Sequence, residues 1–200
     1  MSLIDRVHGS YVHDRRVRVL TSHLAALVPQ GGRVLDVGCG DGLLAMKLGQ
    51  ARPDLEVTGI DVLVRPDTHV PVAPFDGHVI PYPDHGFATV MFVDVLHHTD
   101  DPMVLLREAA RVASRSVVIK DHTRDGWLAY STLRFMDGVG NARHGVRLPH
   151  NYWERRRWHD AISALGLTVG EWRPRLRLYP PPVSLLFDRT LHFAARLDVR

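Results

Sequence analysis

The stretch VLDVGCGDG at residues 34–42 carries an apolar run with one acid into glycine at every second position. A short apolar run is typical of a buried strand. Glycine at Gly38, Gly40 and Gly42 permits a tight turn and lets a ligand approach the main chain closely. Residues 43–51 continue as a helix, whose N-terminal amides and partial positive charge favour anions. The stretch therefore predicts a strand–turn–helix unit that binds a nucleotide.

The spacing of the glycines separates two classes of nucleotide ligand. A dinucleotide-binding turn follows G-x-G-x-x-G/A, and this chain has Leu43 where the last small residue belongs. Asp36 precedes the turn and Asp41 lies within it. Carboxylates would repel a pyrophosphate, whereas they would attract a ligand with a cationic centre and a free ammonium. A nicotinamide-dependent oxidoreductase is the alternative against which this spacing argues.

The bulk composition is that of one globular domain, with 200 residues, of which 45% are hydrophobic and 24% charged. We find no apolar run long enough to span a membrane and no apolar core of a signal peptide near the N-terminus. Cys39 is the single cysteine, which excludes an internal disulfide and a cysteine-cluster metal site. These features predict a cytoplasmic enzyme without an integral membrane segment.

Strands and helices alternate through residue 122. We expect strands at residues 33–37, 55–61, 87–96 and 116–120, and helices at residues 4–28, at residues 43–51 and from Asp101 onward. This alternation is typical of a doubly wound α/β domain, in which right-handed crossovers bring the strand ends to one edge of the sheet. Ligands bind at that edge. Asp36, Asp61, residues 94–98 and the pair Asp121-His122 should therefore meet there.

The pattern changes after residue 122. Residues 126–148 show no clear periodicity. The sequence NYWE from Asn151 is a capping box, which predicts a helix that runs to about Leu165. Residues 167–178 alternate like a strand, and Pro174 within them favours an edge position, where one backbone donor can be missing. Residues 191–197 form the last expected strand.

Three segments together resemble the class I S-adenosylmethionine-dependent methyltransferases, and most closely the small type 11 branch. They are VLDVGCGDG, then VTGIDV at residues 57–62, and FDGHVIPYPDHGFATVMFVDVLHHTDDP at residues 75–102. The resemblance implies a Rossmann-like sheet of seven strands, mostly parallel with the last strand antiparallel, and flanking helices. Residues 191–197 would then insert beside residues 117–120, which leaves the arginine-rich strand outermost.

The resemblance also implies one methyltransferase domain over residues 1–200, divided by role. The divisions are a helical lid at 1–30, a cofactor-binding core at 31–122, an insert for substrate or oligomer contacts at 123–166, and C-terminal hairpin strands at 167–200.

S-adenosylmethionine is the cofactor that the resemblance implies, with S-adenosylhomocysteine as the product. Asp36 matches the acid that faces the cofactor's ammonium, and Gly38 and Gly40 match the turn under its methionine part. Cys39, between these glycines, belongs to the same cofactor-binding turn, where its side chain would be a small filler rather than a nucleophile. Asp61 matches the acid that binds both ribose hydroxyls.

The remaining cofactor contacts are also carried over from the family. Asp76 matches the acid near the adenine amine, Gly77 and His78 would supply backbone contacts, and Phe75 and Val62 would flank the purine. The backbone of Val93 and Asp94 would line the pocket below the methionine, while Tyr11 and Arg16 on the N-terminal helix would close over the cofactor.

Transfer of a methyl group to a hydroxyl or an amine needs a nearby base. His97, Asp121 and His122 are the candidates at the strand ends, and histidine titrates closest to neutrality. The hypothesis is that one of them is the base. The 13 histidines do not show a metal-binding spacing, because His97 and His98 are adjacent and the later histidines lie in unassigned structure. We therefore expect no metal.

The acceptor is not defined by the sequence. Residues 126–158 mix aromatics with arginines, which would suit a hydrophobic small molecule with an anionic head, such as a lipid or a polyketide-like acid, or equally a homodimer interface. Thirteen of the 25 Lys and Arg residues lie in residues 121–200, either as a solvated face or as a wall for an acidic substrate or an anionic membrane surface. Dispersed basic residues argue against nucleic acid. A non-catalytic cofactor-binding subunit that supports a partner protein is the other alternative.

Overall fold

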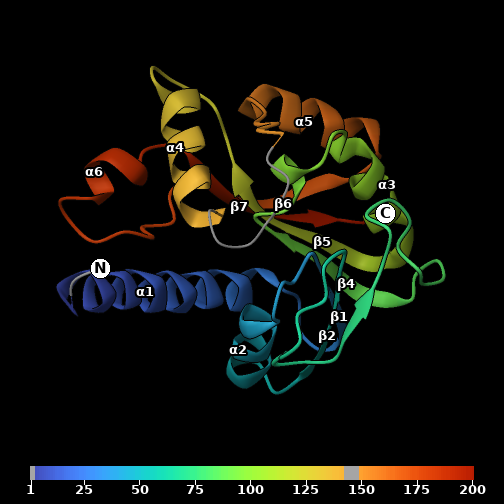
Figure 1. Cartoon of the computed structure of the whole chain (residues 1–200). Helices are drawn as coiled ribbons and strands as arrows, with labels where there is room; N and C mark the ends of the chain where they lie inside the picture. Colours follow the sequence, from blue (N-terminus) through green and yellow to red (C-terminus); the bar gives the residue numbers. More distant parts are fainter. Residues whose placement is uncertain (1–2, 142–148) are drawn as a thin grey trace.

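The computed structural model describes residues 3–141 and 149–200, with side chains for residues 12–138 and 149–200. Within these ranges, seven strands form one sheet in the order β3-β2-β1-β4-β5-β7-β6 (Figure 1). The strands are β1 (Gly32–Val37), β2 (Leu55–Asp61), β3 (Val72–Pro74), β4 (Phe87–Val93), β5 (Ala113–His122), β6 (Thr168–Arg173) and β7 (His192–Asp198). The first five pair in parallel, while β7 runs antiparallel to both of its neighbours, β5 and β6.

Helices cover both faces of the sheet. They are α1 (Leu3–Leu27), α2 (Leu43–Ala51), α3 (Pro102–Val112), α4 (Ala129–Asn141), α5 (Arg155–Ala164) and α6 (Ser184–Phe187), with a short 3₁₀ helix η1 (Leu96–His98). In Figure 1, α1 and α2 lie on one side of the sheet and α3 and α5 on the other, while α4 and α6 stand beyond the sheet and face α1. The C-terminal end of β4 therefore lies between α1 on one side and α4 and α6 on the other.

Alternation along each strand explains the continuous apolar runs. Val34 packs in the cluster that contains Leu20, Leu24 and Leu48 of α1 and α2, while its neighbour Leu35 packs in the cluster under α3 and α5. Successive side chains of a strand point to opposite faces, so a strand covered on both faces must be apolar at every position.

The predicted fold class is confirmed, including the order of the last two strands. Residues 192–198 insert beside β5, with Val117 opposite Leu197 and Lys120 opposite Ala194, and β6 is outermost. None of the helices in the described residues combines the length and the apolarity that a bilayer span needs.

The predicted capping box at Asn151 is wrong. The helix α5 begins at Arg155, with Glu154 at its N-cap. Nδ2 of Asn151 instead donates to the carbonyl oxygens of Thr99 at 3.2 Å and Asp100 at 3.0 Å, which ties the segment before α5 to the end of η1. A side chain that bonds to a distant loop leaves no cap for the local helix.

The predicted strand over residues 167–178 is too long. The strand β6 ends at Arg173, and Pro174 follows it directly. Leu176 and Leu178 leave the sheet and are buried in the cluster under α1. Proline lacks the N–H that a further ladder bond needs, so the strand stops before it.

One strand was not predicted. Between β2 and β4, where we expected no helix, the described chain forms the three-residue strand β3 and a loop. The strand β3 follows Pro71 and ends at Pro74, and it is too short for a periodic pattern. Residues 126–148, which lacked a predicted element, contain α4; residues 142–148 lie outside the described ranges.

Candidate active site

The glycine turn between β1 and α2 is packed on two sides and open at its centre. Gly38, Gly40 and Gly42 all have positive φ, at 73°, 62° and 77°. A Cβ on Gly38 would lie 2.7 Å from a methyl of Val95, and one on Gly42 would lie 2.6 Å from a methyl of Val70. A Cβ on Gly40 would meet nothing within 4 Å. The space beside the main chain at Gly40 is therefore open.

Two carboxylates lie beside this turn at the ends of β1 and β2. Asp36 is 2% exposed, and burial together with the charge of Asp61 raises its pKa to about 7. Asp61 accepts from the amide of Gly40 at 2.7 Å and from that of Leu63 at 2.8 Å. A buried pair of acids is costly unless a cation compensates it. The pair and the open turn fit a ligand that carries an ammonium group and hydroxyls.

Cys39 turns away from this opening. Its Sγ occupies the space above Gly59, where a Cβ would clash with it. Burial raises the pKa of the Cys39 thiol, and the charges of Asp36 and Asp61 raise it further. A thiol that is held protonated is a poor nucleophile. This geometry supports the filler role for Cys39.

The loop after β3 lies against the end of β2. Oδ1 of Asp76 accepts from the amides of His78 and Val79, each at 2.8 Å, and these bonds lower the pKa of Asp76. Gly77 has a φ of 82°, and a Cβ there would lie 3.1 Å from a methyl of Val62. The amide of Phe75 donates to the carbonyl oxygen of Asp61 at 3.2 Å. The residues predicted at the adenine end therefore meet in one place.

Asp94, directly after β4, forms ion pairs with two positively charged side chains. Its carboxylate pairs with Nη2 of Arg16 from α1 and with Nζ of Lys120, which is fully buried. Burial opposes its ionisation, but the charges of Lys120 and Arg16 hold the pKa of Asp94 well below its usual range. Arg16 thus links α1 to the sheet edge. The side chain of Tyr11, the other predicted lid residue, lies outside the described side chains.

Lys120 was missed by sequence reasoning. It ends the apolar run of β5, and a lysine closing a strand that is otherwise buried is the signal that could have found it. The amide of Asp94 also donates to the carbonyl oxygen of Lys120 at 2.9 Å, so the two residues are held together by backbone and side chain.

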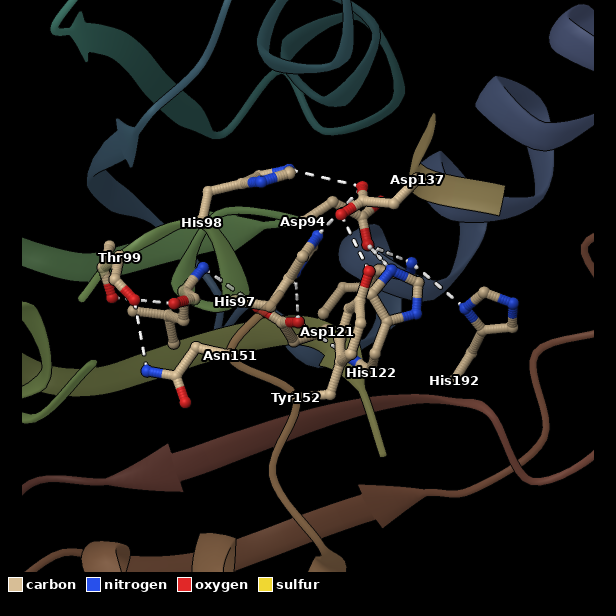
Figure 2. Close-up of polar contacts among 12 residues, drawn as sticks. Asp94, His97, His98, Thr99, Asp121, His122, Asp137, Asn151, Tyr152 and His192 are labelled. Carbon is tan, nitrogen blue, oxygen red and sulfur yellow. Dashed lines mark hydrogen bonds and ion pairs between the residues drawn. The ribbon is translucent and has the colours of Figure 1, made fainter. Parts of the chain in front are cut away.

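The three predicted candidates for the base lie together, with different surroundings. Nδ1 of His97 lies 2.6 Å from Oδ1 of Asp121, which also accepts from the amide of His122 at 2.7 Å (Figure 2). Burial would lower the pKa of His97, but the hydrogen-bonded carboxylate of Asp121 and the nearby carboxylate of Asp137 raise it to about 10. Burial and the charge of Lys120 hold the pKa of His122 well below its usual range. His97 therefore retains its proton near neutrality, whereas His122 is neutral.

Asp137 of α4 completes this polar cluster and was also missed, because its segment showed no periodicity. Its Oδ1 lies 3.5 Å from Nε2 of His97 and 3.6 Å from Nε2 of His98. Its Oδ2 accepts from the hydroxyl of Tyr152 at 2.8 Å and lies 3.5 Å from Nδ1 of His150. A long-range contact of this kind depends on how α4 packs, which no local sequence pattern encodes.

A cleft of about 660 Å³ opens between α1, α4 and α6 next to these groups. Its polar wall consists of Arg16, Asp94, His97, His98, His122, Asp137 and His192, and its apolar wall includes Leu44, Phe135, Met136, Val183 and Phe187. Asp121 does not line it. Val93, the last residue of β4, and Asp94 after it border the cleft, and so does Leu44 in the first turn of α2. The cleft therefore lies close to the glycine turn, which precedes α2.

Comparison with known proteins places this site in context. The family profile described as "Methyltransferase domain" matches residues 11–171. An uncharacterized methyltransferase of Mycobacterium tuberculosis is 41% identical over 182 residues, covering 87% of this chain and 82% of that protein. The 27-O-demethylrifamycin SV methyltransferase of Amycolatopsis mediterranei is 36% identical over 129 residues, which span 54% of this chain and about half, 47%, of that protein.

The fold is also shared with solved structures. A SAM-dependent methyltransferase from Thermotoga maritima superimposes with a TM-score of 0.69 at 17% identity, covering 99% of this chain and 96% of that chain.

Proposed function

The chain belongs to the S-adenosylmethionine-dependent methyltransferase family, and on that premise we propose that it transfers a methyl group to a small molecule held in the cleft between α1, α4 and α6. The open glycine turn at Gly40, with Asp36 and Asp61 beside it, carries the proposal. When bound, S-adenosylmethionine supplies an electrophilic methyl group on a positively charged sulfur. Family membership leaves the oxidoreductase alternative without support.

The residues that would hold the cofactor are those at the ends of β1, β2 and β3. We assign Asp36 to its ammonium, the main chain at Gly38 and Gly40 to its methionine part, and Asp61 to its ribose. The loop that carries Asp76 and Gly77 would contact the adenine beside Val62 and Phe75. Arg16 would help to close α1 over the site through its ion pair with Asp94.

His122 is the base that the geometry favours. Its Nδ1 lies 3.3 Å from the carbonyl oxygen of Leu191, which can only accept, so this contact favours the tautomer with the proton on Nδ1 and the lone pair on Nε2, which lies 3.4 Å from Oδ1 of Asp94. The acceptor's hydroxyl or amine proton would pass to Nε2 of His122 as the acceptor atom forms its bond to the methyl carbon and the carbon–sulfur bond breaks. His97 already holds a proton, and Asp121 positions it.

Replacement of His122 tests this assignment. With an O–H or N–H acceptor, we expect His122→Gln to lower kcat by about 10²–10⁴, the usual contribution of a general base. Binding of S-adenosylhomocysteine should persist. Unchanged single-turnover rates in His122→Gln would exclude His122 as the base.

The apolar wall of the cleft supports a hydrophobic acceptor. The relative named for 27-O-demethylrifamycin SV provides the first acceptor class to try. A homodimer, the absence of nucleic-acid partners and a cytoplasmic location stay predictions from the composition.

Calorimetric titration with S-adenosylhomocysteine tests the cofactor. We expect micromolar binding to the wild type and binding at least tenfold weaker to Asp61→Ala, a change of about 1.4 kcal/mol. Asp67→Ala, which removes an exposed acid from the loop after β2, is the matched control and should bind normally. No binding to the wild type would contradict the cofactor assignment. Methyl release with a panel of hydrophobic acceptors would then separate an enzyme from a non-catalytic binding subunit.

A further inference from the structure

Three metal-ligating side chains converge on the wall of the acceptor cleft. They are His97 and His98 from η1 and Asp137 from α4, and all three line the cleft. One ligand atom from each, two imidazole nitrogens and a carboxylate oxygen, lie within 4.8 Å of one another. Figure 2 shows both rings directed toward the Asp137 carboxylate.

The separations between these atoms suit a shared ion better than direct hydrogen bonds. Oδ1 of Asp137 lies 3.5 Å from Nε2 of His97 and 3.6 Å from Nε2 of His98. Hydrogen bonds between nitrogen and oxygen usually measure about 2.7–3.2 Å. Two ligands on a tetrahedral zinc ion, each about 2.0–2.1 Å from the metal, are separated by about 3.3–3.4 Å.

Two of these three ligands are oriented by hydrogen bonds at the atom that would not bind the metal. Nδ1 of His97 lies 2.6 Å from Oδ1 of Asp121, an arrangement that directs the proton to Nδ1 and Nε2 toward Asp137. Oδ2 of Asp137 accepts from the hydroxyl of Tyr152 at 2.8 Å, so Oδ1 faces the histidines. Outer partners of this kind orient metal ligands and strengthen binding. The contacts therefore match a carboxylate–histidine–metal arrangement.

We propose that His97, His98 and Asp137 bind a divalent transition-metal ion, with Zn²⁺ the best fit, in the acceptor cleft. Two nitrogens and one oxygen favour zinc over Mg²⁺ or Ca²⁺, which prefer oxygen ligands. Three protein ligands leave a coordination position for the oxygen of an acceptor hydroxyl or enol, whose pKa the ion would lower. This role rests on the proposed function and narrows the acceptor to one that binds through oxygen.

The sequence analysis predicts no metal because His97 and His98 are adjacent. The sequence shows neither the 3₁₀ turn that carries them nor the packing of α4 against it. In the structure the two rings lie 4.0 Å apart between centroids, and the third ligand comes from a distant helix. The alternative to a metal ion is a doubly protonated His97, whose Nδ1–H faces Asp121 and whose Nε2–H faces Asp137.

Zinc binding by the whole chain, measured in competition with a chromophoric chelator, tests the site directly. We expect micromolar or tighter binding to the wild type and at least tenfold weaker binding to His98→Ala and to Asp137→Asn. His13→Ala is the matched control, because His13 lines the same cleft outside the cluster, and it should bind zinc like the wild type. Circular dichroism confirms that each variant is folded, and Asp137→Asn keeps an acceptor for Tyr152.

A spectrum and a parallel titration complete the test. Co²⁺ in place of zinc should give intense visible bands, typical of four ligands, that weaken in both cluster variants. Absence of zinc binding to the wild type, or equal binding by all variants, would overturn the metal site and leave the doubly protonated His97. S-adenosylhomocysteine titrations of the same proteins would show separately whether the proposed function fails.

Discussion

At the scale of single residues, Asp36 indicates the charge of the ligand that this site would favour. The charge of Asp61, another acid, acts on Asp36. Cys39, between the turn glycines, offers no positive charge that would compensate the two acids. Burial and Asp61 raise the pKa of Asp36 to about 7, against an ordinary value of 3.8. The free protein therefore loses stability as the pH rises from about 4 to about 7, because over this range the folded state keeps a proton that the unfolded state has already released. The loss is on the order of 4 kcal/mol.

Ligand binding should reverse this penalty, because an ammonium favours the Asp36 carboxylate. We expect the affinity for S-adenosylhomocysteine to rise with pH up to about 7 and to level off above it, with proton release below that pH. Calorimetry across roughly pH 5.5–8.5 (about 1.5 units on either side of the expected midpoint), in buffers of different ionisation enthalpy, measures both effects. Asp36→Asn should bind weakly at every pH, while Glu56→Gln, which changes an exposed acid on β2, should keep the wild-type profile. A flat wild-type profile would contradict the assignment.

At the scale of elements, Arg111 of α3 holds the loop that precedes β4. Its guanidinium donates to the carbonyl oxygens of Ile80 at 3.0 Å and Tyr82 at 2.9 Å, and it pairs with Glu108 at 2.7 Å and Asp84 at 2.8 Å. These bonds anchor the C-terminal part of the loop that begins at Phe75, on which the adenine contacts are proposed to lie.

Loss of this anchor should affect both stability and cofactor binding. We expect Arg111→Ala to lower the free energy of unfolding by about 1–3 kcal/mol, because several charge-assisted bonds to loop carbonyls are lost at a partly exposed site. S-adenosylhomocysteine should bind up to about tenfold more weakly. Urea denaturation and calorimetry measure the two quantities. Arg107→Ala, an exposed arginine on the same helix, should change neither, and equal effects of the two variants would refute the anchor.

Elements with strong local signals were predictable, and elements defined by packing were not. The Asp101-Pro102 start of α3 is visible in the sequence, and the structure confirms it, with Asp101 capping the amide of Met103 at 3.0 Å. The segment that forms α4 has glycines and mixed polarity, so its helix depends on contacts such as that between Asp137 and Tyr152. The glycine turn and the acids beside it could therefore be located from the sequence, and Lys120 had the signal of a lysine that closes a buried run, whereas Asp137 required the fold.

On the scale of the whole molecule, the centre of the parallel sheet followed from the sequence because β1, β4 and β5 contain long runs of buried residues. The cleft did not, since it arises where α1, α4 and α6 meet beyond the sheet and depends on residues far apart in the chain. An aromatic layer contacts the backbone of His122, which lines the polar wall of the cleft. Trp153, Trp158, Phe193 and Trp172 form successive contacts, with ring centroids 4.8, 5.1 and 4.2 Å apart.

This aromatic layer should couple global stability to the active site. Trp158 is 1% exposed, and its Nε1 donates to the carbonyl oxygen of His122 at 3.0 Å. We expect Trp158→Ala to cost about 3–5 kcal/mol and to lower the Tm by about 6–20 °C for a chain of this size. It should also reduce methyl transfer below the Tm, because His122 loses a backbone support. Trp127→Ala removes a tryptophan that is 84% exposed and should leave the Tm unchanged in differential scanning calorimetry. A stable Trp158→Ala protein with normal turnover would mean that the end of β5 is held by the sheet alone.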